Sequence, residues 1–224
     1  MNKYIIFLLL LAAGPIYSQK YCHCDSFVDD TWWATCDTTV LKSNARFYRL
    51  FDCEGLYWKL ESLDGKQEWV SQLEASLAWY PRLNTLVFND GDSSVLLCMG
   101  CSGGFVLCSY SIWIKSGLRV FASFSDLVYD DDSLNLVIYM SAPDSMKLYD
   151  LNQNKVHDIP YPVARFNASL PEVIGNIRDL IEDHTVSGSV LLLTYRYVDP
   201  DKPGEWQKDI LRIDLEALGI IRGR

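Results

Sequence analysis

Apolar runs of strand length, separated by tight turn signals, are the feature that most constrains how this chain can fold. The run at 55–62 is rich in aromatic and branched residues, and Asp64 and Gly65 then supply a strong hairpin-turn signal before the run at 66–70. Similar runs occupy 45–51, 84–88, 95–99, 105–114, 118–124, 134–140, 147–150, 155–158, 186–198 and 207–215. Because parallel strands need a long crossover connection, the short connections predict antiparallel pairing.

We therefore predict a mainly β protein, an antiparallel meander sheet or sandwich with one or two covering helices. A capping box at Ser71 predicts a two-turn helix over 72–79, and a second one at Ser169 predicts an amphipathic helix that reaches Asp183. A short terminal helix is expected over 215–221. The runs also fall into groups of three or four, so a small or incomplete β-propeller is the alternative fold.

The beginning of the chain has the layout of a secretory signal peptide. Lys3 supplies a basic start, an apolar run follows over 4–13, and a small residue, Ser18, precedes a polar segment. Cleavage is therefore expected near Ser18, with 1–18 as the signal peptide. This layout predicts a secreted or periplasmic protein.

The expected mature chain, residues 19–224, is long enough to form one domain around its own core. The full chain carries a formal net charge of −9 at pH 7. An acidic chain is poorly suited to nucleic acid or to an anionic membrane surface, and it suits a basic partner better. We therefore predict a single β-rich domain with a cysteine-rich N-terminal segment (19–53). We expect no nucleic-acid partner and no transmembrane anchor.

Seven cysteines, an odd number, all follow the predicted signal peptide. Export to an oxidising compartment makes disulfides the default expectation, and the odd number leaves at least one free thiol or an intermolecular bond. The candidates are Cys22, Cys24, Cys36, Cys53, Cys98, Cys101 and Cys108. Spacing alone does not give the connectivity, but bonds among the first four would hold the N-terminal segment together.

The twenty residues at 95–114 carry no charge, and they are long enough to cross a membrane as a helix. Glycines and serines interrupt the stretch, and the flanking runs are typical of strands, so a hairpin that turns between Gly100 and Gly104 is the better interpretation. Cys98 and Cys101 form a C-x-x-C pair, but no helix begins there, as redox enzymes require. A structural disulfide or a buried thiol is therefore favoured over a redox or metal site.

Catalytic patterns are absent from the sequence. The three histidines, His23, His157 and His184, belong to no recognisable catalytic or metal-binding motif. We therefore predict no catalytic residue, no metal site and no cofactor. A secreted hydrolase with carboxylate or Cys/His catalysis not evident in the sequence is the alternative.

Aromatic residues in the first third of the chain are the best candidates for a binding site. The candidate binding residues are Trp32, Trp33, Tyr57, Trp58 and Trp69. Neighbouring residues on a strand point to opposite faces, so one member of each adjacent pair is expected outside the core. Exposed aromatics suit protein or glycan ligands. The sequence thus favours an exported, non-enzymatic binding protein, such as an inhibitor or immunity-type protein acting on a protein partner, or a glycan binder.

Overall fold

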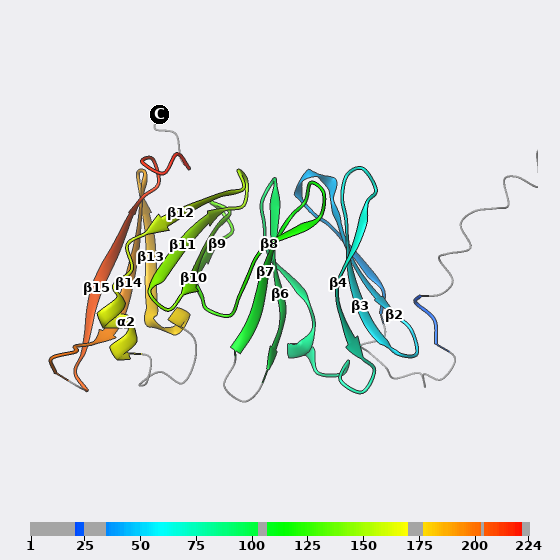
Figure 1. Ribbon diagram of the computed structural model, residues 1–224, viewed down its shortest axis with the longest axis horizontal. Helices are drawn as coiled ribbons and strands as arrows, with labels where there is room; N and C mark the ends of the chain where they lie inside the picture. The colour runs from blue at the N-terminus through cyan, green and yellow to red at the C-terminus, as the bar shows by residue number, and fades with distance from the viewer. Residues whose placement is uncertain (1–20, 25–34, 103–106, 170–176, 203, 221–224) are drawn as a thin grey trace, which may run out of the picture.

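The computed structural model describes residues 21–24, 35–102, 107–169, 177–202 and 204–220. These residues form four antiparallel sheets, and each sheet is a meander of consecutive strands. The sheets stand in a row in chain order, with the N-terminal sheet at the right of Figure 1 and the C-terminal sheet at the left. The predicted signal peptide, Trp32 and Trp33 lie outside the described residues.

Three sheets have four strands each, and the last has three. The first contains β1 (Asp37–Val40), β2 (Arg46–Phe51), β3 (Gly55–Glu61) and β4 (Gln67–Glu74). The second contains β5 (Leu86–Asp90), β6 (Ser94–Ser102), β7 (Leu107–Ile114) and β8 (Arg119–Phe124). The third contains β9 (Leu127–Asp131), β10 (Leu136–Ala142), β11 (Ser145–Asp150) and β12 (Lys155–Ile159). The fourth contains β13 (Ile181–Ser187), β14 (Val190–Val198) and β15 (Trp206–Asp214).

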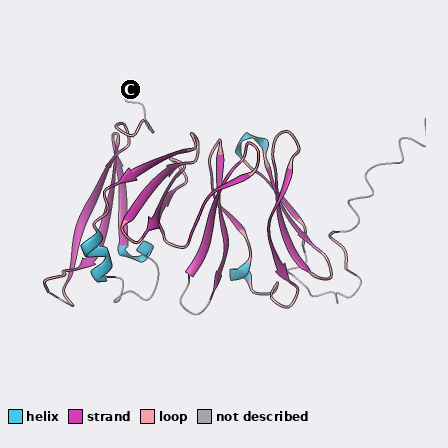
Figure 2. Cartoon of the chain, viewed as in Figure 1, coloured by secondary structure: helices cyan, strands magenta, loops and turns pink. Residues whose placement is uncertain are grey.

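The helical elements are short and few. One α-helix, α2 (Val163–Ser169), packs on β14 through Phe166, which is fully buried. Three single-turn 3-10 helices complete the described elements: η2 (Lys42–Asn44), η3 (Pro81–Leu83) and η5 (Ile177–Leu180). Figure 2 shows how small the helical part is beside the strands.

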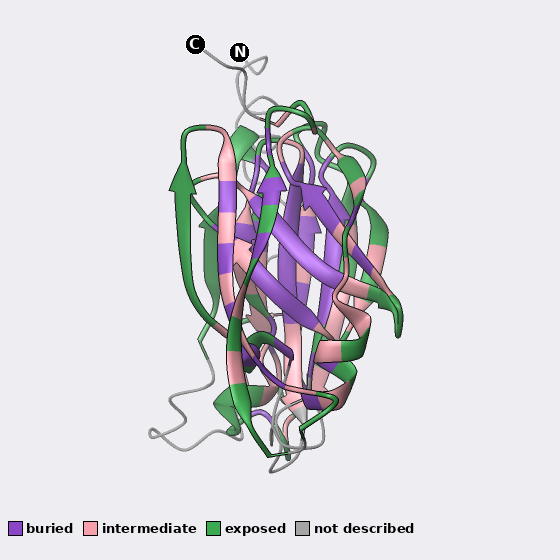
Figure 3. Cartoon of the chain, turned by 90° about the vertical axis from the view of Figure 1, so that its left-hand side faces the viewer, coloured by how far each residue is buried: buried purple, intermediate pink, exposed green. Residues whose placement is uncertain are grey.

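The two middle sheets are buried on both faces. On β6, Val95 and Leu97 pack in one core cluster with the first sheet, whereas Leu96 and Cys98 pack in another with the third sheet. Strand β10 divides its side chains between the second and the fourth sheet in the same way. Burial on both faces explains why these strands read as continuous apolar runs rather than as an alternation of apolar and polar residues. Seen from the fourth sheet, the buried residues gather inside the row (Figure 3).

The row of sheets is open. None of the sheets closes into a barrel, and no core cluster of the described residues contains both the first and the last sheet. The mainly β, antiparallel meander and sandwich prediction is confirmed. The sheets follow one another as propeller blades do, but without ring closure. Within the described ranges, no helix has the length and apolar character needed to cross a membrane.

The helix predicted over 72–79 is wrong. Strand β4 runs through Gln67–Glu74, and turns follow at 75–79. The Ser71 hydroxyl does not cap a helix; it lies 2.6 Å from the Thr85 hydroxyl in a hydrogen bond to the second sheet. Leu73 packs against the core cluster between the first and second sheets, which we call the first core cluster. This burial outweighs the local capping signal.

The predicted helix from Ser169 to Asp183 is also wrong in its described part. Ser169 ends α2, where its hydroxyl donates to the Arg165 carbonyl (2.6 Å) and accepts from the Val198 N–H (2.7 Å). Residues 177–180 form η5, and β13 begins directly after them. At the C-terminal end, 215–219 forms turns rather than a helix.

The uncharged stretch 95–114 is the hairpin β6–β7, as predicted. The strand extends into the expected turn, because Gly100 and Cys101 belong to β6. A bulge interrupts the register between Cys98 and Cys101. Gly100 takes a φ of +101°, and a Cβ there would lie 2.7 Å from the Leu83 carbonyl oxygen, so only glycine fits this bulge.

Candidate functional site

Disulfides fix the N-terminal segment against the first sheet. Cys22 is bonded to Cys36, and Cys24 is bonded to Cys53 in the turn between β2 and β3. A third bond joins Cys101 to Cys108, which leaves Cys98 as the free cysteine among the described residues. Three disulfides indicate an oxidising, extracellular or periplasmic setting.

Three aromatic rings gather on the outer face of the first sheet, and we call them the aromatic cluster: Tyr21, Tyr57 and Trp69. The ring centroids lie 5.5 Å apart for Tyr21 and Tyr57, 5.8 Å for Tyr21 and Trp69, and 6.1 Å for Tyr57 and Trp69. Trp69 is 50% exposed. Such edge-to-face and tilted contacts stabilise the rings relative to one another while leaving ring surface open to solvent.

Strand alternation produces this arrangement. On β3 the side chains of Leu56, Trp58 and Leu60 enter the core, so Tyr57 and Lys59 point outward. The register places Trp69 of β4 directly opposite Lys59, whose Nζ lies 5.2 Å from the Trp69 ring centroid. This distance is within the range of a cation–π contact.

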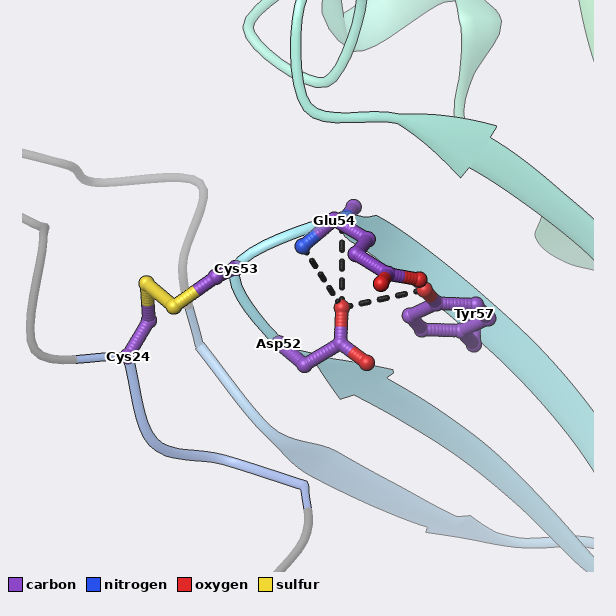
Figure 4. Close-up of a disulfide and its surroundings, with 6 residues drawn as sticks. Cys24, Asp52, Cys53, Glu54 and Tyr57 are labelled. Atoms are coloured by element: carbon purple, nitrogen blue, oxygen red, sulfur yellow. Dashed lines mark hydrogen bonds between the residues drawn. A yellow bond between two sulfur atoms is a disulfide. The ribbon is translucent and has the colours of Figure 1, made fainter.

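Tyr57 is held in place by the turn that precedes its strand. Its hydroxyl donates to Asp52 Oδ1 at 3.0 Å, and the same oxygen accepts the backbone N–H groups of Glu54 (2.8 Å) and Gly55 (3.2 Å), as Figure 4 shows beside the Cys24–Cys53 bond. Partial burial and this hydrogen bond raise the pKa of Tyr57 to about 12. The phenol therefore stays protonated at neutral pH, and its ring orientation is fixed.

A shallow cavity of about 460 Å³ opens beside the cluster. It is lined by Tyr21, Tyr57, Trp69, Val70, Ser71 and Gln72. This volume lies within the range of small-ligand sites, and the lining combines aromatic faces with hydroxyl and amide groups. The arrangement can hold a ligand that is apolar on one side and hydrogen-bonding at its edge.

Charges of both signs lie on this face. The strand register places Arg46, Lys59 and Glu61 on the outer side of β2 and β3, and Arg46 lies 3.6 Å from Glu61 as an ion pair. The carboxylates of Asp52 and Glu54 lie beside Tyr57, so acidic groups also flank the aromatic cluster.

No protein-family model matches this chain, and no curated protein is found that resembles it in sequence.

The structure brings two of the nominated residues together and separates a third. Tyr57 and Trp69 share the cluster, whereas Trp58 is 1% exposed in the first core cluster and takes no part in the site. Tyr21 was not nominated. The only signal that could have found it is its position directly before Cys22, whose disulfide fixes the segment.

Acidic groups line a second, smaller cavity of about 230 Å³ between the third and fourth sheets. Its lining includes Asp130, Glu182, Asp183 and His184. Burial raises the pKa of Asp130, although Arg178 lies 2.9 Å away as an ion-pair partner. The lining of this cavity contains no serine or cysteine nucleophile beside His184.

Proposed function

We propose that this chain is an exported, non-enzymatic binding protein that binds a glycan at the aromatic cluster. The open grouping of Tyr21, Tyr57 and Trp69 on an outer sheet face is the observation that carries this proposal. The signal-like N-terminus and the three disulfides support an exported location.

The chemistry of the site favours a sugar over a basic protein. A sugar ring has an apolar C–H face that packs on aromatic rings, and a rim of hydroxyls that needs hydrogen-bonding groups. Gln72 also lines the cavity, and its exposed amide can hydrogen-bond such a rim. A basic protein partner would need a uniformly acidic surface, whereas Arg46 and Lys59 place positive charge on this face.

The first prediction tests the aromatic cluster. The mature chain, residues 19–224, is applied to an array of neutral and charged polysaccharides, and affinity for a retained glycan is measured by titration calorimetry. Trp69→Ala should weaken binding by on the order of tenfold or more, because an exposed aromatic anchor commonly dominates the binding energy. Trp206→Ala is the matched control, since Trp206 is 43% exposed on the fourth sheet at the other end of the row.

Two results would overturn the proposal. Retention of no polysaccharide would remove the glycan as ligand. Equal losses from Trp69→Ala and Trp206→Ala would remove the aromatic cluster as its site.

A hydrolase is the second candidate, because of the carboxylates that line the smaller cavity. Asp130, with its raised pKa, would serve as the acid of a carboxylate pair with Asp183 or Glu182. Turnover of a retained glycan that disappears in Asp130→Asn, with binding unchanged, would establish this function in place of simple binding.

A further inference from the structure

Three cysteine sulfurs lie together where β6 ends and β7 begins. Cys101 on β6 is directly opposite Cys108 on β7, and the two are bonded. The Sγ atoms of Cys98, Cys101 and Cys108 all lie within 4.8 Å of one another. Cys98 and Cys108 are buried, whereas Cys101 is partly exposed.

The bulge in β6 is what makes this grouping possible. Residues three apart on a regular strand point to opposite faces of the sheet, so Cys98 and Cys101 would ordinarily be separated. The one extra residue of the bulge, with Gly100 at a φ of +101°, reverses the alternation. As a result both sulfurs lie on the same side of the strand.

The Cys98 thiol already contacts the disulfide. Its Sγ lies 3.9 Å from Cys101 Sγ in a sulfur hydrogen bond, and only Cys98 can donate, because a disulfide sulfur carries no proton. With all three sulfurs within 4.8 Å of one another, the Cys98 sulfur lies beside the Cys101–Cys108 bond, so exchange requires it to move into line with that bond. Thiol–disulfide exchange needs this approach of a thiolate to a disulfide sulfur.

We propose that Cys98, Cys101 and Cys108 form an internal thiol–disulfide exchange centre with Cys101 as the shared sulfur. The Cys98 thiolate attacks Cys101 Sγ, the Cys98–Cys101 bond forms, and the Cys101–Cys108 bond breaks. Cys108 leaves as a thiolate and takes up the proton that Cys98 released to solvent. The number of disulfides and thiols is unchanged, so no oxidant or reductant is required.

The exchange changes which strands are cross-linked. In the observed pairing a bond joins β6 to β7, whereas after exchange the bond lies within β6 and the two strands are held by the remaining pairing alone. Cys101 also lines a cavity of about 220 Å³ together with Ser71 and Gln72 of β4. Because these two residues also line the cavity of the aromatic cluster, one strand separates the exchange centre from the proposed binding site. The centre does not depend on the identity of the ligand there.

Burial controls the rate. It raises the pKa of the Cys98 thiol, so little thiolate exists at neutral pH. Because the thiolate is the attacking species, the exchange rate should rise by about tenfold for each pH unit until Cys98 is ionised.

The wild-type protein provides the second prediction. Samples are held at about pH 7 and about pH 9, quenched in acid, alkylated, and digested without reduction for mass spectrometry. The label should start on Cys98 and move with time to Cys108, faster at the higher pH, while the four cysteines of the N-terminal segment stay unlabelled. Label on Cys98 alone at every time, label on Cys101, or label spread over all cysteines would overturn the proposal.

A variant pair gives an independent answer. Cys108→Ser should form the Cys98–Cys101 bond and show no free thiol, whereas two alkylated cysteines in the folded variant would contradict the proposal. Cys98→Ser is the matched control, because it keeps the observed Cys101–Cys108 bond and also shows no free thiol. If Cys108→Ser does not fold, the wild-type mapping still decides.

Discussion

Lys115 is a buried residue that links the first and second sheets. It is 5% exposed, and its Nζ lies 2.6 Å from Asp90 Oδ1 while donating to the carbonyl oxygens of Lys42 (2.7 Å) and Gly91 (2.6 Å). Burial lowers the pKa of Lys115, and the Asp90 carboxylate opposes that shift. The Lys42 side chain continues the network to Asn135 in the turn between β9 and β10 of the third sheet. Lys115 and Lys42 together thus link elements of three sheets.

The third prediction concerns this buried ion pair. Lys115→Met should lower the free energy of unfolding by about 3 kcal/mol or more, because it leaves Asp90 and two carbonyls without their cation. Urea unfolding monitored by tryptophan fluorescence measures the change. Lys155→Met, at an exposed position of β12, should leave the midpoint unchanged. Equal midpoints for the two variants would show that Lys115 is dispensable.

For single residues, the sequence predicted that neighbours on a strand face opposite sides of the sheet, but not which of them faces the core. Alternation required that Tyr57 and Trp58 face opposite ways, and they do, but the pattern does not say which one enters the core. Nothing in the sequence indicated that Lys115 is buried, because a lysine before Ser116 and Gly117 is typical of a solvent-exposed turn. Its partners come from segments distant in the sequence.

At the scale of elements, the two N-terminal disulfides hold their segment in place, as side-chain packing holds the other elements. They attach residues 21–24 to the start of β1 and to the turn after β2. Tyr21 is thereby held in the aromatic cluster. Tyr21 is therefore a part of the proposed site that depends on covalent cross-links rather than on strand register.

The fourth prediction separates these effects. The double variant Cys24→Ser/Cys53→Ser should lose about 3 kcal/mol of stability, since its bond closes a loop with a sequence separation of 29. Ligand binding should also weaken, because Tyr21 is held less firmly. Thermal melting and calorimetry measure the two quantities, and Cys98→Ser is the control that removes no disulfide. Full affinity in a destabilised double variant would show that the Cys22–Cys36 bond alone holds Tyr21 in the site.

The positions of strands and hairpins were predictable where the sequence has a strong apolar pattern bounded by turn residues. The hairpins around Gly65 and Asn154 follow from their turn residues, which both adopt positive φ. The short strands β1 and β9 were missed, because one is polar and exposed throughout and the other ends in two aspartates. The helix errors share a cause: capping boxes are local, and contacts with a neighbouring sheet overrode them.

At the scale of the whole molecule, three cores lie between four sheets, and each core cluster of the described residues joins two sheets that are neighbours in the row. Continuous apolar runs on β6 and β10 are the sequence signal of burial on both faces. The order of the sheets was not predictable, since antiparallel meanders of this length pack equally well as a two-layer sandwich.

The fifth prediction follows from this layering. Amide hydrogens of β6, β7, β10 and β11 should exchange most slowly, because these are the inner strands of sheets covered on both faces. Strands β1 and β13, which lie at sheet edges and are largely exposed, should exchange fastest. Hydrogen exchange followed by mass spectrometry resolves these segments. Uniform protection across all four sheets would show that the molecule opens only as a single unit.

The open row also has a consequence for how such a protein can change in length. A closed ring fixes the number of its members, because every addition alters the curvature that lets the first meet the last. An open row has no such constraint, and each added meander would extend it by about 10 Å, the usual spacing of packed sheets. The surface that carries Tyr57 and Trp69 lies at one end of the row, with the fourth sheet at the other. Duplication of an inner sheet would therefore increase the distance between these two ends without changing the structure of either. The number of inner sheets would thus set the length of the molecule.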